Sequence, residues 1–189
     1  TRAGKDKDIG IATSARRSYI DAFIPLFTGG TGFVASPRWF DYQLKVADAD
    51  DDDSGTWSVF LFGFQDKLFI STPDEFAQSS DPDTQGDLSA QYGTHRLVLT
   101  SEQDLGGDWT YMAQPAIGYD TIDVGLGSSI ALVQSFLVLD TRFELKWAPS
   151  DVLAVTTGLD GNVTRYQIDF SLPFFPTDAG FDPLAEREP

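Results

Sequence analysis

The stretch SFLVLDTRFELKWAPSD, residues Ser135 to Asp151, decides the fold because two kinds of side chain alternate along it. The odd positions from Leu137 to Trp147 read Leu, Leu, Thr, Phe, Leu and Trp, whereas the even positions from Val138 read Val, Asp, Arg, Glu and Lys. Successive side chains of a β-strand point to opposite faces, so the pattern predicts a strand with one apolar and one charged face. The apolar face meets a core in a soluble protein and lipid in a membrane barrel, and alternation alone leaves both open.

The composition favours β structure. The chain has 189 residues, 13% aromatic side chains and 17 glycines, which fits one domain of strands joined by many turns. It has no cysteine, which excludes disulfides, thiolate zinc sites and a cysteine nucleophile. Its first residues, TRAGKDKD, include neither an initial Met nor a signal peptide, which fits either a mature protein or an excised piece of a longer one, and we expect the second.

The charge argues against nucleic acid as a partner. The chain has 13 Lys and Arg against 29 Asp and Glu, a formal charge of −16, which repels phosphate backbones and anionic lipid surfaces. No apolar run approaches the length of a transmembrane helix, about 18 residues, whereas the strands of a membrane barrel alternate and never produce such a run.

Alternating runs along the chain predict an all-β, antiparallel up-and-down meander of about seven strands, which we expect to be one segment spanning residues 1–189. A further run, Asn162 to Phe170, continues or extends the last of them, and only PDEFAQSSD near Asp74 suggests a helical turn. The runs cover Ile9–Asp21, Trp39–Val46, Thr56–Asp66, Thr94–Thr100, Trp109–Asp123, Ile130–Trp147 and Val152–Asp160.

The connections between these runs differ in length in a regular order. Short polar connections (ADADDDDSG, SEQDLGGD, APSD) alternate with long ones (AFIPLFTGGTGFVASPR, STPDEFAQSSDPDTQGDLSAQYG) or with the tight turn GLGSS. Alternate connections of a meander lie at the same end, so one end would carry short turns and the other mostly long loops. Outer-membrane barrels have this asymmetry, although a sandwich can produce it by chance.

Tryptophans mark the ends of the predicted strands. Trp57 and Trp109 follow short turns, Trp147 precedes one, and Trp39 would lie at the opposite rim. We therefore predict that these four side chains form an aromatic belt at the membrane interface. The alternative is that they pack at strand ends and core corners, as Trp does in many β proteins.

The charged face of the opening strand is predicted to line a lumen. Unpaired burial of its charges in a soluble core would be costly, and several runs reach the roughly 9 to 11 residues with which a tilted strand crosses a bilayer. The run WSVFLFGF is apolar on both faces, so Phe60, Phe62 and Phe64 need a partner such as a plug inside the barrel. The predicted lumen residues are Asp140, Arg142, Glu144 and Lys146.

Four segments resemble, in order, the early barrel of TonB-dependent outer-membrane receptors, most closely those of myxobacteria and related Gram-negative bacteria. They are IATSARRSYIDAFIP (Ile11–Pro25), PRWFDYQLKV (Pro37–Val46), FLFGFQDKLF (Phe60–Phe69) and THRLVL (Thr94–Leu99). The resemblance implies a barrel of about 22 strands closed around an N-terminal plug, of which this chain supplies roughly a third. No plug, TonB box or closing aromatic strand is visible, and the chain ends DPLAEREP, so a fragment is expected.

The same resemblance implies function and partners. It implies import of a scarce nutrient, such as an iron chelate, vitamin or glycan, across the bacterial outer membrane. The implied partners are outer-membrane lipid, the plug domain, TonB and a small-molecule substrate, without a cofactor or enzymatic activity.

The residues offer little for catalysis or metal binding. His95 is the single histidine and no G-x-S-x-G motif is present, so a Ser-His-Asp device is not expected. The acidic turn beginning at Asp48 has calcium-type oxygen ligands, but its twelfth position is Val59 instead of Glu, so a solvated turn is predicted.

Two further readings remain open. One is a soluble secreted β-sandwich or small barrel that binds carbohydrate or another ligand, and the other is a small outer-membrane barrel with a structural role. The surroundings of one set of side chains distinguish a barrel segment from a soluble sandwich. A barrel segment exposes them on an open sheet, whereas a sandwich packs them against a second sheet: Leu137, Leu139, Phe143 and Leu145.

Overall fold

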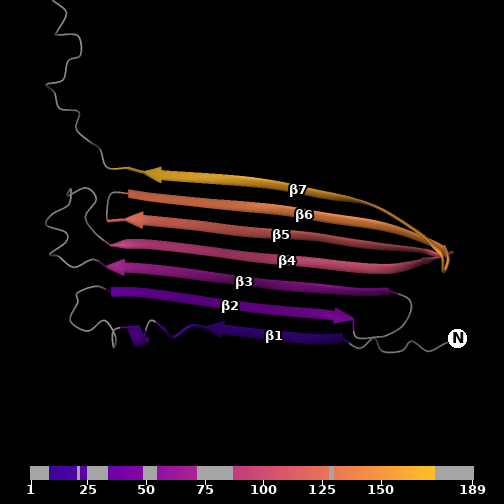
Figure 1. Cartoon of the computed structure of the whole chain (residues 1–189), viewed down its shortest axis with the longest axis horizontal. Coiled ribbons are helices and arrows are strands. Elements are labelled where there is room, and N and C mark those ends of the chain that lie inside the picture. Colours follow the sequence, from indigo (N-terminus) through magenta and orange to yellow (C-terminus); the bar gives the residue numbers. More distant parts are fainter. Residues whose placement is uncertain are drawn as a thin grey trace, which may run out of the picture.

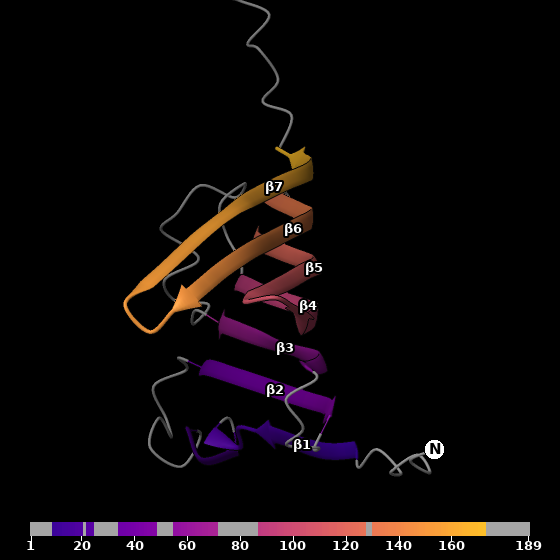
Figure 2. The same cartoon turned by 90° about the vertical axis from the view of Figure 1, so that its right-hand side faces the viewer.

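The computed structural model describes residues 9–20, 22–24, 34–48, 55–71, 87–127 and 130–172. Its strands form a single antiparallel sheet in chain order (Figure 1). They are β1 (Ile9–Arg17), β2 (Val34–Asp48), β3 (Gly55–Ser71), β4 (Leu88–Gly106), β5 (Trp109–Leu126), β6 (Ile130–Ser150) and β7 (Leu153–Ser171). The predicted all-β, up-and-down meander is therefore confirmed. The sheet is not closed, because β1 and β7 lie at opposite edges (Figure 2).

The strands are longer than the alternating runs because pairing continues through polar segments. The segment SEQDLG belongs to β4, so the turn before β5 consists only of Gly107 and Asp108. Their φ angles of 62° and 70° lie in the left-handed region, which glycine adopts without steric cost. At the other end of the chain, β7 runs unbroken to Ser171, so Asn162–Phe170 continues the last run.

The first strand is shorter than the run Ile9–Asp21 had predicted. It ends at Arg17, and the backbone N–H of Ser18 donates to the carbonyl of Trp39 at 2.8 Å. The Ser18 hydroxyl then accepts from the N–H of Ile20 at 3.2 Å, and residues 20 and 22–24 are helical. A serine side chain that bonds the backbone two residues ahead favours a turn over a strand. The helical turn predicted near Asp74 falls outside the described residues.

The register gives the sheet two faces, which we name the Leu137 face and the Asp140 face. Register shifts occur only next to two short turns, so the assignment holds along every strand. One row across the Leu137 face is Ala15, Tyr42, Gly63, His95, Tyr119, Leu137 and Arg165. One row across the Asp140 face is Ala12, Lys45, Phe60, Val98, Ala116, Asp140 and Asn162.

The two ends of the sheet are also distinct. At the short-turn end β2 leads to β3, β4 to β5 and β6 to β7, and at the long-loop end the chain makes its remaining connections (Figure 1). Neither face is covered by a second layer within the described residues, where Val138 is the single buried hydrophobic side chain. Leu137, Leu139 and Phe143 are 40%, 48% and 42% exposed, and Leu145 is half-buried.

Candidate functional site

The Leu137 face carries a broad apolar band in the half of the sheet nearest the short turns. On β6 the band runs from Trp147 to Leu137, and on β5 it runs from Trp109 to Tyr119. Beyond it the same face turns polar, with Ser135 on β6 and Thr121 on β5. Further members of the band are Ile9, Ile11, Leu44, Val46, Val59, Leu61, Leu97, Leu99, Val155, Leu159 and Val163.

The height of the band matches the apolar thickness of a bilayer. Leu137 and Trp147 are ten residue steps apart on one strand. At about 3.3 Å per residue, and at the tilt of about 35–45° found in outer-membrane barrels, these steps would span about 23–27 Å along the membrane normal. The outward apolar band of outer-membrane barrels is about 25 Å tall.

Tryptophans lie at the short-turn margin of this band. Trp109 and Trp147 are cross-strand partners, and their rings stack with centroids 5.8 Å apart. Trp57 occupies the same face, two residues after β3 begins. Trp57, Trp109 and Trp147 therefore share one face near the short-turn end, and their role as a membrane-interface belt stays a prediction.

Trp39 does not belong with the other three, which corrects the predicted four-membered belt. It pairs with Asp66 and lies on the Asp140 face, opposite to the face that carries Trp57, Trp109 and Trp147. The neighbours Phe40 and Tyr42 alternate with Asp41, so the parity of β2 already assigns Trp39 to the face that carries Asp41.

The predicted lumen residues share the Asp140 face and join neighbouring strands. Asn162 donates to Asp140 at 2.5 Å, while Arg142 contacts Glu144 on its own strand and lies 3.9 Å from Asp160. Lys146 is exposed between its partners Thr110 and Thr156. The Arg142 and Glu144 side chains are 53% and 31% exposed, so solvent screens this ladder of charges.

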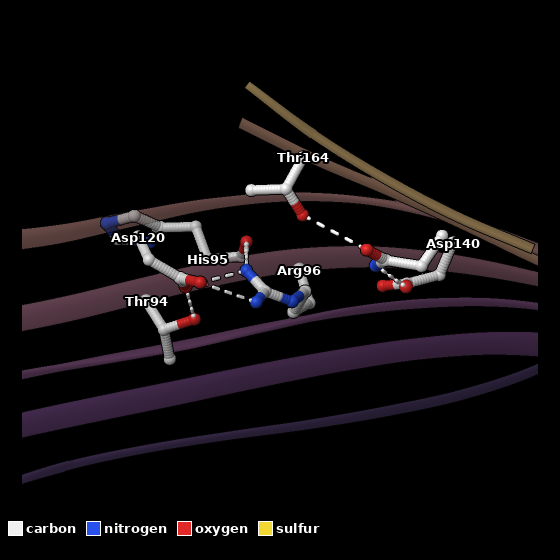
Figure 3. Close-up of polar contacts among 7 residues, drawn as sticks. Thr94, His95, Arg96, Asp120, Asp140 and Thr164 are labelled. Atoms are coloured by element: carbon white, nitrogen blue, oxygen red, sulfur yellow. Dashed lines mark hydrogen bonds and ion pairs between the residues drawn. The ribbon is translucent and has the colours of Figure 1, made fainter. Parts of the chain in front are cut away.

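A more buried ion pair lies near the middle of the Asp140 face (Figure 3). Both nitrogens at the end of the Arg96 guanidinium donate to Asp120 at 2.7 Å, and the Thr94 hydroxyl donates to the same carboxylate. The Arg96 and Asp120 side chains are only 21% and 16% exposed. Arg96 reaches across Gly118, which has no side chain to block it. Such a two-pronged Arg–carboxylate contact fixes geometry as well as energy.

The apolar side of the sheet changes from one face to the other along the strands, which the sequence reading did not predict. In the long-loop half the Asp140 face becomes apolar, with Leu68 on β3, Ile122 on β5 and Phe136 on β6. The Leu137 face there carries polar side chains such as Lys67 and Asp123. The two apolar surfaces are therefore offset along the strands and lie on opposite faces.

Phe60 lies between two hollows on the polar half of the Asp140 face. Its ring stacks on Phe62 with centroids 5.0 Å apart. It borders one hollow of about 510 Å³, which Gln43 and Lys45 also line, and a second of about 640 Å³, which Arg142 also lines. These volumes are in the range of ligand and partner sites, roughly 300–1,000 Å³.

The remaining candidates have ordinary surroundings. His95 lies on the Leu137 face, and its Nδ1 is 2.8 Å from the Tyr42 hydroxyl. In the described part of the chain, His, Asp and Glu side chains form no group of three that could hold a metal ion. Most of the acidic turn after Asp48 lies outside that part. No described helix is long and apolar enough to span a bilayer.

No protein-family model, curated protein or solved structure matches this chain. The candidate sites are therefore the surfaces that the register defines: the apolar band, the charged ladder with Phe60, and the Arg96–Asp120 pair.

Proposed function

We propose that this chain forms part of the membrane-spanning wall of a TonB-dependent outer-membrane receptor. The apolar band on the Leu137 face is the observation that carries the proposal. It is exposed, about as tall as the apolar core of an outer membrane, and bordered at the short-turn end by the stacked pair Trp109 and Trp147. In this arrangement the Leu137 face meets lipid and the Asp140 face meets the lumen.

The open edges support a wall that continues beyond these strands. The strands alternate in direction, so β1 and β7 run the same way, from the short-turn end to the long-loop end. They cannot pair with each other in antiparallel fashion, and closure requires an odd number of additional strands. Because unpaired edges are not tolerated in the hydrocarbon region, the missing strands come from the same receptor.

The polar half of the Asp140 face fits the inside of such a wall. Its charges would be costly against lipid but are stable beside water or a polar partner. Phe60 lies between two hollows and its ring stacks on Phe62, which suits contact with a domain that fills the lumen. By the resemblance of the sequence, that domain is the plug and TonB is the energy-transmitting partner.

The proposed role is import of a scarce nutrient, such as an iron chelate, vitamin or glycan. This step of the proposal rests on the resemblance of four short segments, and no residue of the chain is assigned to the substrate. A soluble carbohydrate-binding sandwich would need a layer packed on Leu137, Leu139 and Phe143, and the described residues provide none. A small independent barrel would need two edge strands that run in opposite directions, so that they could pair as antiparallel neighbours and close the sheet.

The absence of cysteine from this chain allows a direct test. Single cysteines are placed at Leu139, Asp140, Val133 and Leu132 in the complete gene product, labelled with an environment-sensitive fluorophore and reconstituted into phosphatidylcholine vesicles. We expect brominated lipid to quench the label at position 139 and not at 133, which shares its face and strand. The label at 140 should respond to an aqueous quencher instead. Protein that remains in water, with equal aqueous quenching at 139 and 133, would overturn the proposal.

A further inference from the structure

Asp66 is an isolated charge at the start of the apolar long-loop half of the Asp140 face. It lies on β3, directly between two aromatic cross-strand partners, Trp39 on β2 and Tyr92 on β4. The complete row across the face is Trp39, Asp66, Tyr92, Ile122, Gln134 and Ile168. From this row to the long-loop end, the described strands carry no other charged side chain on the Asp140 face.

Within the part of the chain that the structure describes, the Asp66 side chain has no cationic partner. It forms no ion pair or side-chain hydrogen bond there, and it is exposed. The adjacent Lys67 belongs to the opposite face of the sheet, and the nearby Arg16 is already bound to Asp41 at 3.0 Å. The carboxylate of Asp66 is therefore open to a cation from outside the sheet.

The two aromatic neighbours favour an organic cation over a metal ion. Directly opposite residues have Cβ atoms about 4.5–5.5 Å apart, so a cation held by Asp66 lies within reach of Trp39 and Tyr92. These two residues are 46% and 40% exposed. Aromatic rings attract cations within about 6 Å, Trp most strongly, and such sites recognise quaternary ammonium groups. A single carboxylate between two rings lacks the set of oxygen ligands that Ca²⁺ or Mg²⁺ requires.

Two hollows of about 420 Å³ each meet at Trp39 and Asp66. These volumes are within the range of small-molecule sites, roughly 300–1,000 Å³. The first hollow is partly polar, and its lining includes Arg16, Asp41 and Phe64. The Phe64 ring also contacts that of Tyr92, with centroids 5.4 Å apart.

The second hollow is mainly apolar and extends toward the long-loop end. Arg38 and Lys67 also border it, but the register places their side chains on the opposite face. Its apolar lining includes Leu68, Ala90, Ile122 and Val124. A ligand seated across Trp39 and Asp66 would therefore place a cationic group beside the carboxylate and an apolar group in this hollow.

We infer that Asp66, Trp39 and Tyr92, together named the Asp66 site, bind a small organic cation that carries an apolar group, such as a quaternary ammonium compound. Asp66 supplies the opposite charge, the two rings contact the cation, and the apolar hollow holds the rest of the ligand. The charge of −16 favours the approach of a cation over that of an anion. The inference goes beyond the proposed function and does not require it, because the Asp140 face is open whatever the Leu137 face contacts.

Calorimetric titration of the complete gene product in non-ionic detergent tests the inference, with the heats of protein-free micelles subtracted. Three probes share a hexyl chain and differ in charge: hexyltrimethylammonium, hexanesulfonate and hexanol. We expect hexyltrimethylammonium to bind most tightly, and tetramethylammonium, which lacks the chain, to bind more weakly than it does. Equal affinities for hexyltrimethylammonium and hexanesulfonate, or no binding of hexyltrimethylammonium, would overturn the inference.

Matched variants assign the charge recognition to Asp66. Asp66→Asn keeps the shape of the side chain, removes its charge and should weaken hexyltrimethylammonium binding by up to about fivefold, as loss of an exposed ion pair does. Asp123→Asn removes the same charge from the Leu137 face and should leave the affinity unchanged. Equal effects of the two variants would overturn the inference, since the general charge of the protein would then be the cause.

Trp39 provides an independent measure of the same site. Trp39→Leu removes the ring but keeps an apolar side chain, and it should weaken hexyltrimethylammonium binding by about twofold to fivefold, the range of an exposed cation–π contact. Trp39→Phe retains an aromatic ring and should retain most of the affinity, which separates lost recognition from misfolding. An equal loss in both Trp39 variants would overturn recognition of the cation by the ring.

Failure of this inference is distinguishable from failure of the proposed function. Binding in detergent does not depend on what the Leu137 face contacts, so a label at position 139 that lipid does not quench would overturn the wall and leave the Asp66 site intact. Quenching at position 139 without charge-selective binding would overturn the Asp66 site and leave the membrane-spanning wall intact.

Discussion

Gly118 provides the space through which Arg96 reaches Asp120. A Cβ atom at position 118 would overlap the guanidinium of Arg96, which now donates to both carboxylate oxygens of Asp120 at 2.7 Å. Because the overlap involves the end of a flexible side chain, Arg96 can swing aside, and the cost is the lost ion pair and not a backbone shift.

Gly118→Ala should therefore lower the free energy of unfolding by roughly 1.5–3 kcal/mol, the range for hydrogen bonds to charged groups. Urea unfolding followed by circular dichroism measures the change. Gly161→Ala is the control, since its nearest atom is a movable methyl of Thr141 at 3.3 Å. In an Arg96→Met background the cost of Gly118→Ala should nearly vanish, and an undiminished cost there would show that the ion pair is not its cause.

Gly63 plays a different part on the Leu137 face. A Cβ there would lie 2.7 Å from the backbone carbonyl oxygen of Thr94, as well as close to the His95 ring and the Tyr42 hydroxyl. A carbonyl in the middle of a sheet cannot move aside, so Gly63→Ala should destabilise the sheet by about 1–3 kcal/mol, as overpacking does.

Tyr42→Phe separates this backbone effect from the hydrogen bond between Tyr42 and His95. That substitution removes only the 2.8 Å contact and should cost about 1 kcal/mol or less. Thermal unfolding of both variants tests the difference. A larger loss for Tyr42→Phe than for Gly63→Ala would contradict the close backbone approach as the reason for the glycine.

The alternation of apolar and polar residues predicted the strands and, for many side chains, the face of the sheet on which they lie. The division of β6 into the Leu137 and Asp140 faces follows directly from the period of two residues in its sequence. Trp39 was assigned to the belt by its position along the strand, which does not determine the face of the sheet. Its parity in β2 assigns it to the Asp140 face, opposite to the face of the other three tryptophans.

The change of apolar face was visible in the sequence as a change of phase. On β6 the even positions are mostly apolar from Ile130 to Val138 and charged from Asp140, while the odd positions turn from mostly small or polar to apolar after Ser135. A reading that assigns each strand one apolar face overlooks such a change. The Arg96–Asp120 pair, in contrast, could not be predicted, because its members are separated by 24 positions and meet only through the register of β4 on β5.

The turn between β4 and β5 gives a local prediction. Gly107 and Asp108 both have positive φ, at 62° and 70°, and Asp108 also accepts a hydrogen bond through its carbonyl from Ala148 at 2.9 Å. A β-branched residue is strained in this region, so Gly107→Val should cost about 1–2 kcal/mol. Asp108→Gly keeps the carbonyl and relieves the strain, so it should be neutral or slightly stabilising. Thermal melts of the two variants test this, and destabilisation by Asp108→Gly would show that the Asp side chain itself supports the turn.

The change of apolar face predicts where a charge on the Leu137 face is tolerated. Leu139 and Val133 lie on the same strand and face and are 48% and 40% exposed, but only Leu139 lies within the apolar band. In the reconstituted complete gene product, Leu139→Arg should cost about 1–3 kcal/mol, because Leu139 lies between the long-loop margin of the band and its middle, and Val133→Arg about 1 kcal/mol or less. Guanidinium unfolding in vesicles measures both. A soluble sheet with these exposures would tolerate the two substitutions equally. Equal and small effects in vesicles would therefore contradict a lipid-facing band. A larger effect at Leu139 than at Val133 would show that contact with lipid, and not exposure of the side chain, is the cause.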